Sequence, residues 1–178
     1  MGRRAVASNV LFIDGLKVPA ADRSGEEGRG FHYNLHGMNP ERILIAAEAV
    51  GLGRAARYAK ERVVFGRPIG QNQAIQHPLA QRWIELEAAE LIVFRAAAAY
   101  DRGEQSGPYA NAAKYCAAEA GFRARETAIM TLSGTGYARE YQVERYFREI
   151  QIARIAPVSP QLILSHIAER VLGMPKSY

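Results

Sequence analysis

Residues 78–100, PLAQRWIELEAAELIVFRAAAAY, and residues 108–127, PYANAAKYCAAEAGFRARET, decide the fold of this chain. In both stretches apolar or small residues recur at every third or fourth position, which places them on one face of an α-helix. The first stripe is Leu79, Trp83, Leu86, Ala89, Val93, Ala97 and Tyr100, and the second is Tyr109, Ala113, Cys116, Ala120, Ala124 and Thr127. Because the polar turn between them is short, we expect the two helices to run antiparallel in a bundle.

Further helices are indicated on both sides of this pair. Asn39-Pro40 is a helix start signal, with asparagine as the cap and proline at the first helical position, and the helical spacing continues to Tyr58. The second helix begins either at an Asn72 cap, with Pro78 as a bend, or only at Pro78. Shorter helices are expected at about 140–153 and 161–172. The predicted fold class is all-α, an up-and-down bundle of the four-helix type.

The first 38 residues differ in character from the rest. Apolar residues 11–13 and 16–18 flank Asp14-Gly15, a pattern typical of a β-hairpin. One hairpin is not stable alone in water, so we expect it to dock on the helices or to be the remnant of a larger sheet. The chain therefore divides into a β-remnant with a linker, 1–38, and a helical bundle domain, 39–178.

The composition is that of an ordinary globular protein, with 48% hydrophobic and 23% charged residues among 178. The net charge of +5 raises the question of nucleic acid, but Lys and Arg alternate with acidic residues, so no nucleic-acid partner is expected. No stretch approaches the ~20 apolar residues of a membrane span, and no signal peptide is indicated. Cys116 is the only cysteine, which excludes an internal disulfide and suits the reducing cytoplasm.

The common catalytic constellations are missing from the sequence. The four histidines lack metal-ligand spacing, so no metal site is expected. The segment 133–136, SGTG, lacks the lysine and the preceding strand of a phosphate loop, and it suits a helix terminator because glycine readily supplies a positive φ. Cys116, among alanines inside a helix, indicates a structural thiol and not a nucleophile.

An ordered set of motifs is more specific. Arg62-Val63-Val64-Phe65-Gly66 is followed by Gln73, then by the turn 133–137, SGTGY, and by the segment 140–149, EYQVERYFRE. This order and spacing resemble the carboxy-terminal helical domain of flavin-dependent acyl-CoA dehydrogenases. Residues 11–31 resemble the segment that precedes this domain in the family, so the resemblance covers nearly the whole chain.

The resemblance implies FAD, an acyl-CoA substrate, and a homodimer or homotetramer that passes electrons to a further acceptor. The reaction of the family is α,β-dehydrogenation of an acyl-CoA thioester: a carboxylate takes the α-proton while the β-hydrogen leaves as hydride to the flavin. Such a carboxylate needs a dry site that raises its pKa toward neutrality. Because the family's amino-terminal helical domain and most of its β-domain are not in this chain, we expect the isolated chain to be inactive.

By this resemblance, Glu41 matches the helix-start position at which one branch of the family places its catalytic base. Asn39 and Arg42 match positions that line the acyl-CoA pocket. From the residues alone, the simpler interpretation of Glu41 is an acidic group favoured by the dipole of the first helical turn. The larger branch carries its base where this chain has Pro157. Proline also has no N–H to offer the thioester oxygen, so either a neighbour such as Val158 donates or the substrate sits differently.

The other candidates match cofactor positions. Arg62 matches an arginine that reaches the flavin pyrophosphate of a neighbouring subunit, a role that needs a fixed positive charge; the alternative is a partner for the C-terminal dipole of the first helix. The remaining matches are Phe65 and Gln73, which line the same cofactor, Ser133 and Gly134, in a small-residue turn near its adenosine end, and Ser159, a hydroxyl near the flavin.

Two other interpretations stay open. In the first, the chain is a helical module that oligomerises and has no catalytic role. In the second, the chain belongs to a flavin-dependent oxidase or monooxygenase of the same fold. Such relatives often lack the loop glutamate as well.

Overall fold

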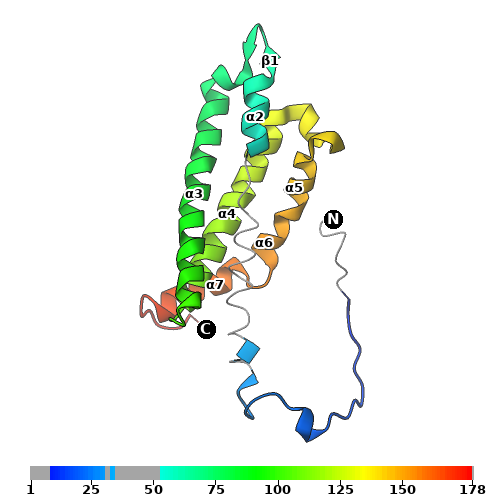
Figure 1. The fold of residues 1–178 in the computed structure, drawn as a ribbon, viewed down its shortest axis with the longest axis vertical. Helices are drawn as coiled ribbons and strands as arrows, with labels where there is room; N and C mark the ends of the chain where they lie inside the picture. Colours follow the sequence, from blue (N-terminus) through cyan, green and yellow to red (C-terminus); the bar gives the residue numbers. More distant parts are fainter. Residues whose placement is uncertain (1–8, 31–32, 35–52, 178) are drawn as a thin grey trace.

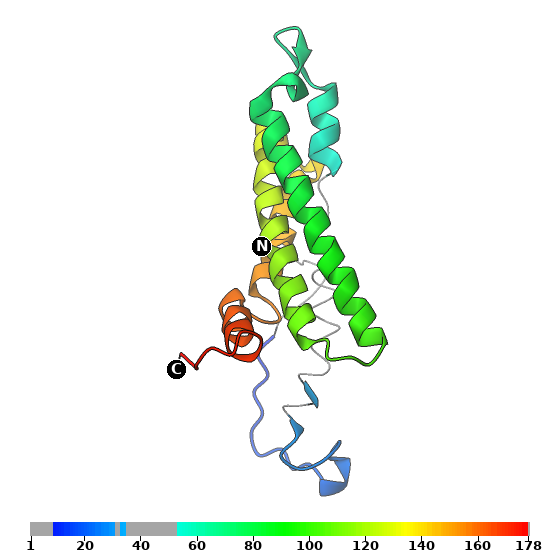
Figure 2. The same ribbon diagram turned by 90° about the vertical axis from the view of Figure 1, so that its left-hand side faces the viewer.

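A pair of long helices dominates the computed structural model, which describes residues 9–30, 33–34 and 53–177. Helices α3 (Gln73–Asp101) and α4 (Gly107–Leu132) lie side by side over most of their length, as Figure 1 and Figure 2 show. With a rise of 1.5 Å per residue, α3 is roughly 44 Å long. The helical-bundle fold and the pairing of the two alanine-rich helices are therefore confirmed.

Besides α3, four shorter helices contact α4. These are α2 (Gly53–Glu61), α5 (Val143–Glu149), α6 (Gln151–Ile155) and α7 (Pro160–Arg170). Strands β1 (Val63–Val64) and β2 (Arg67–Pro68) form a small antiparallel sheet. Four 3₁₀ turns complete the set: η1 (Ala20–Asp22), η2 (Ile69–Gln71), η3 (Ser133–Tyr137) and η4 (Arg139–Tyr141).

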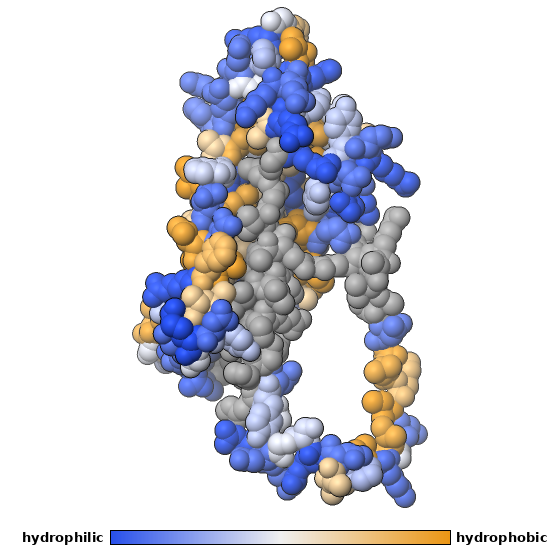
Figure 3. All heavy atoms as spheres, viewed as in Figure 1, coloured by the Kyte–Doolittle hydropathy of each residue, from blue (hydrophilic) through white to orange (hydrophobic). Residues whose placement is uncertain are grey.

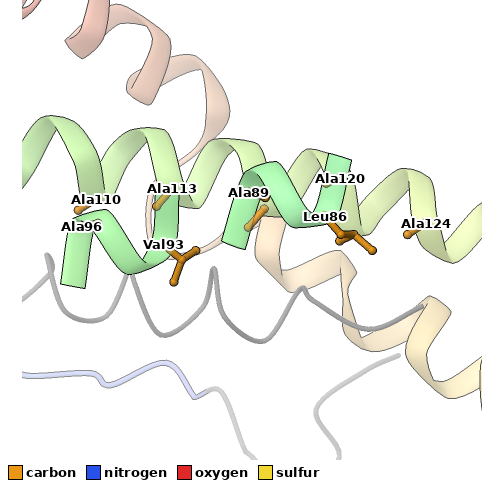
Figure 4. Packing of buried hydrophobic residues seen from close by; sticks show 9 residues of the cluster. Leu86, Ala89, Val93, Ala96, Ala110, Ala113, Ala120 and Ala124 are labelled. Atoms are coloured by element: carbon orange, nitrogen blue, oxygen red, sulfur yellow. The ribbon is translucent and has the colours of Figure 1, made fainter. Parts of the chain in front are cut away.

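Alanine forms most of the core between α3 and α4. Ala89, Ala96, Ala110 and Ala113 are completely buried and, with Leu86 and Val93, make up much of the contact in Figure 4. Small side chains let the two helix backbones approach closely, so the pair is held by a long, shallow interface. A second cluster, Ala55, Leu132 and Val143, ties α2 and α5 to the end of α4.

The structure decides between the two expected starts of the second helix. α3 begins directly after Asn72, and Pro78 lies inside the helix. The Asn72 side chain does not cap the helix; its Oδ1 accepts from Arg67 at 2.6 Å, and its Nδ2 donates to the carbonyl of Ile69 at 3.0 Å. Asn72 therefore marks the helix start and also fixes the preceding hairpin.

The helix expected at 140–153 is interrupted. Arg125 on α4 donates to the carbonyl of Phe147 at 2.8 Å and to the side chain of Gln151 at 2.8 Å. In a continuous helix the Phe147 carbonyl would accept from the N–H of Gln151, and the break between α5 and α6 falls at this point.

The hairpin expected around Asp14-Gly15 needs correction. Gly15 does adopt a positive φ of 62°, but residues 11–13 and 16–18 form no strands, and their apolar side chains, including the 94% exposed Phe12, face water. Two short strands without a covering layer gain too little buried area to pair. Within the described residues, the two-stranded sheet lies at 63–68 instead.

The start of the first helix lies outside the described residues. α2 confirms that the helix continues past Tyr58, but the Asn39-Pro40 start signal and the boundary between 38 and 39 fall in the undescribed segment 35–52. The division into 1–38 and 39–178 stays a prediction.

Candidate functional site at the hairpin end of the bundle

The hairpin after α2 projects an aromatic side chain into water. Val63 pairs with Pro68 and Val64 with Arg67, which leaves Phe65-Gly66 as a two-residue turn. Both turn residues have positive φ, 52° and 77°, as the favoured hairpin turns require. The Phe65 ring is 100% exposed. Phe65 thus combines a strained backbone with a ring that packs against none of the described residues.

Arg62 stands at the base of the same hairpin, with its backbone fixed. Its N–H donates to the carbonyl of Tyr58, and its own carbonyl accepts from the N–H of Ile69, both at 2.8 Å. The residue is exposed, so the guanidinium extends from a rigid attachment point. Gln73, also exposed, begins α3 directly after η2.

Gly70 is a site-building residue that the sequence did not single out. A Cβ atom at this position would lie 2.8 Å from the carbonyl oxygen of Ala59, so η2 can pack on α2 only with glycine there. The sequence Pro68-Ile69-Gly70 indicates a turn, but nothing in it predicts the close approach of Gly70 to the Ala59 carbonyl.

Ser133 and Gly134 lie where α4 ends, and both are exposed. The positive φ that stops the helix, 53°, belongs to Ser133, so the expectation that a glycine supplies it was wrong. Gly136 is required for another reason: a Cβ atom there would lie 2.9 Å from the carbonyl oxygen of Ile129, because the turn folds back onto α4. At Gly134 the space around a Cβ atom is open, so backbone is accessible there.

A side-chain hydrogen bond joins α2, the helix before the hairpin, to η3, the turn after α4. The hydroxyl of Thr135 in η3 hydrogen bonds with that of Tyr58 on α2 at 3.2 Å and donates to the carbonyl of Leu132 at 2.7 Å. The Tyr58 ring meets the edge of Tyr141, with ring centroids 6.0 Å apart, and Arg54 donates to the Tyr141 carbonyl at 3.4 Å. Only helical spacing had drawn attention to Tyr58, and its hydroxyl contact follows from the fold alone.

The hairpin end of the bundle therefore collects five candidates on exposed, tethered loops: Arg62, Phe65, Gln73, Ser133 and Gly134 (Figure 1). The structure places Ser159 elsewhere, at the start of α7 near the opposite end of α3. Its Oγ accepts from the N–H of Leu162 at 3.3 Å, which is a helix-capping contact. Glu41, Asn39 and Arg42 lie outside the described residues.

The rest of the described chain offers no competing chemistry. Cys116 is half-buried, and burial raises the pKa of its thiol, which keeps it protonated and unreactive. In the described segments, no three side chains of His, Cys, Asp or Glu come together in a way that could hold a metal ion. No helix in those segments is both long and apolar enough for a membrane span.

The fold and the loops define a class of protein: a helical bundle that carries exposed loops at one end. Comparison with known proteins makes this specific, because residues 28–172 match the family described as acyl-CoA dehydrogenase, C-terminal domain. The chain belongs to this family.

Individual relatives agree. The chain is 43% identical over 175 residues to acyl-CoA dehydrogenase FadE12 of Mycobacterium tuberculosis, covering 94% of this chain and 45% of the relative. It superimposes on the glutaryl-coenzyme A dehydrogenase–glutaryl-CoA complex with a TM-score of 0.85 and 35% identity, covering 93% and 44% of the two chains. It is also similar to the prolyl acyl carrier protein oxidase AnaB, with a TM-score of 0.83, 29% identity and coverage of 88% and 43%. The chain thus spans less than half the length of the relatives it matches.

Residues at the hairpin end fit a flavin dinucleotide. A guanidinium on a fixed backbone suits a pyrophosphate, which it binds through paired N–H donors. The uncovered Phe65 ring offers an aromatic face, and the open space at Gly134 admits close approach of a ligand to the backbone. The Arg62 side chain suits the pyrophosphate, the Phe65 ring suits an aromatic ring system, and the Gly134 backbone leaves room for a ligand.

Proposed function

We propose that this chain is the carboxy-terminal domain of a flavin-dependent acyl-CoA dehydrogenase, which oxidises the Cα–Cβ bond of an acyl-CoA thioester. The observation that carries the proposal is the hairpin end of the bundle, where Arg62, Phe65 and Gln73 are tethered through Tyr58 and Thr135 to the turn at Ser133 and Gly134. In this proposal the hairpin end contacts the FAD of a neighbouring subunit, and that FAD would accept the hydride. In this proposal Arg62 holds the pyrophosphate, and the exposed Phe65 and Gln73 line the cofactor.

The proposed base is Glu41, with Asn39 and Arg42 lining the acyl-CoA pocket. Its support is the family membership, combined with Pro157 at the position where the larger branch of the family carries its base, because proline offers no carboxylate. In this role Glu41 takes the α-proton, a task that needs a site which favours the neutral carboxyl group.

We further propose that the active protein is a homodimer or homotetramer. Its support is the apolar surface along α3, where Trp83, Ile84, Leu91 and Phe94 are all more than half exposed (Figure 3). The electrons would leave through a separate acceptor protein. A cytoplasmic location is part of the proposal, since the single cysteine suits a reducing compartment. Light scattering on the purified protein tests the assembly.

A hybrid protein tests the activity. In it, this chain replaces the matching 175 residues of FadE12, so that the relative supplies the remaining domains. Acyl-CoA thioesters of several chain lengths should bleach the flavin of the hybrid. Glu41→Gln should keep FAD bound and abolish bleaching; bleaching at the unsubstituted rate in that variant would remove Glu41 as the base.

The second candidate function is a flavin oxidase acting on a thioester carried by another protein. The similarity to AnaB, with the same fold at a TM-score of 0.83, favours it. Production of hydrogen peroxide by the reduced hybrid in air, without an added electron acceptor, would support the oxidase over the dehydrogenase.

A further inference from the structure

A fully buried lysine lies in the amino-terminal third of α4. Lys114 has 0% exposure and lies between Ala113 and Tyr115, and its Nζ donates to the carbonyl of Val158 at 2.6 Å, across 44 positions of sequence. Burial lowers the pKa of this ammonium group, while the charge of Glu119 opposes part of that effect. Taking an ammonium group out of water is costly, and one carbonyl returns only part of the lost hydration.

The partner of Lys114 lies in the connector between α6 and α7, residues 156–159. Pro157 and the following Pro160 lack N–H groups, so these positions cannot donate to turn hydrogen bonds. Ser159 is occupied in capping α7. The contact from Lys114 therefore ties the connector to the centre of the bundle.

The charge of Lys114 acts on a whole peptide group. The Val158 carbonyl belongs to the same peptide group as the N–H of Ser159. A cation on the oxygen withdraws electron density from the group and makes this N–H a stronger donor. Lys114 thus sets both the orientation of the connector and the polarity of the backbone at Ser159.

We propose that Lys114 is a positioning residue, which holds the Val158–Ser159 peptide group in the orientation that Ser159 needs to meet the flavin of its own subunit, whereas the hairpin end reaches the flavin of a neighbouring subunit. The identity of the ligand rests on the proposed function; the positioning of the connector does not.

Nuclear magnetic resonance of the 178-residue chain tests the positioning. Lys114→Met should move the Val158 carbonyl carbon and the Ser159 amide proton upfield, and amide exchange in residues 158–164 should become roughly tenfold to a hundredfold faster, as expected for loss of a hydrogen bond to a charged group. The matched control is Ile163→Ala, which removes a side chain on α7 that is 1% exposed. It should speed exchange in α7 but leave the Val158 carbonyl resonance in place.

Unchanged resonances in Lys114→Met, or the same carbonyl shift in Ile163→Ala, would overturn the proposal. A titration of the unsubstituted chain gives a second test that does not depend on the folding of a variant. The Val158 carbonyl should follow the midpoint of the Lys114 Nζ resonance, and a carbonyl that does not respond to that midpoint would also overturn it.

The hybrid with FadE12 tests the identity of the ligand separately from the positioning of the connector by Lys114. There Lys114→Met should shift the flavin absorption spectrum and lower kcat at little changed KM, whereas Ile163→Ala should alter neither spectrum nor kcat. An unsubstituted hybrid that acyl-CoA does not reduce would contradict the proposed function, while the carbonyl shift would still decide whether Lys114 positions the connector.

Discussion

Phe65 concentrates backbone strain and exposure in one residue. A φ of 52° costs a non-glycine residue about 1 kcal/mol, and the 100% exposed ring gains nothing from the described part of the chain. Phe65→Asn creates Asn-Gly, the preferred pair for such a hairpin turn. We expect this variant to raise the free energy of unfolding of the chain by about 1 kcal/mol in urea titrations, and to weaken FAD binding in the hybrid.

The control for this substitution is Phe65→Tyr, which keeps the ring and the strain. It should leave both stability and FAD affinity close to those of the unsubstituted protein. Loss of stability in Phe65→Asn, with FAD affinity retained, would mean that the ring has a packing role and no part in the ligand site.

Lys114 makes stability depend on pH. Burial lowers the pKa of its ammonium group below the ordinary value of a lysine, so at a pH between the folded and unfolded pKa values the unfolded chain holds a proton that the folded chain has lost. Folding stability contributed by this group should therefore rise as the pH is raised through that interval. Burial raises the pKa of the Cys116 thiol, which acts in the opposite direction. Lys114→Met should lack this rise, so the unfolding free energy of the unsubstituted chain, minus that of the variant, should increase with pH. A difference that stays constant with pH would contradict this account.

At the scale of elements, the α3–α4 pair depends on small residues. Ala89 is completely buried against α4, whereas its neighbour Ala88 is exposed on the same helix. Ala89→Leu should force the helices apart and cost roughly 1–3 kcal/mol of stability, measured by thermal or urea unfolding. Ala88→Leu adds the same side chain in water and should change stability little. Equal effects of the two substitutions would show that the interface is loose.

Helical periodicity predicted most of the fold, because the apolar stripes at 79–100 and 109–127 are long and regular. It could not place the interruption between Glu149 and Gln151, where Arg125 of α4 hydrogen bonds with the Phe147 carbonyl, 22 positions along the chain. Nor could the sequence pattern show that residues 11–18 form no strands, because local strand propensity does not tell whether other residues cover the hairpin. In the site, the family motifs marked Arg62, Phe65 and Gln73. The Tyr58–Thr135 bridge arises only when residues 77 positions apart meet.

At the scale of the whole molecule, the chain matches only part of the length of its relatives. It spans 45% of the length of FadE12 and leaves large apolar side chains exposed along α3. Both observations agree with a domain that is covered by other domains or by copies of itself. In the proposed function, the hairpin end would form one wall of a shared site, and its residues would need the remaining walls to bind the cofactor well.

The affinity of the hybrid for FAD, measured by quenching of flavin fluorescence, tests this claim most directly. Arg62→Met should weaken FAD binding by roughly tenfold to a hundredfold, because it removes a charge-assisted contact to the pyrophosphate. Arg57→Met, which removes an equal charge from an exposed position on α2, should leave the affinity unchanged. Equal FAD affinity in both variants and in the unsubstituted hybrid would contradict the assignment of the hairpin end to the flavin site.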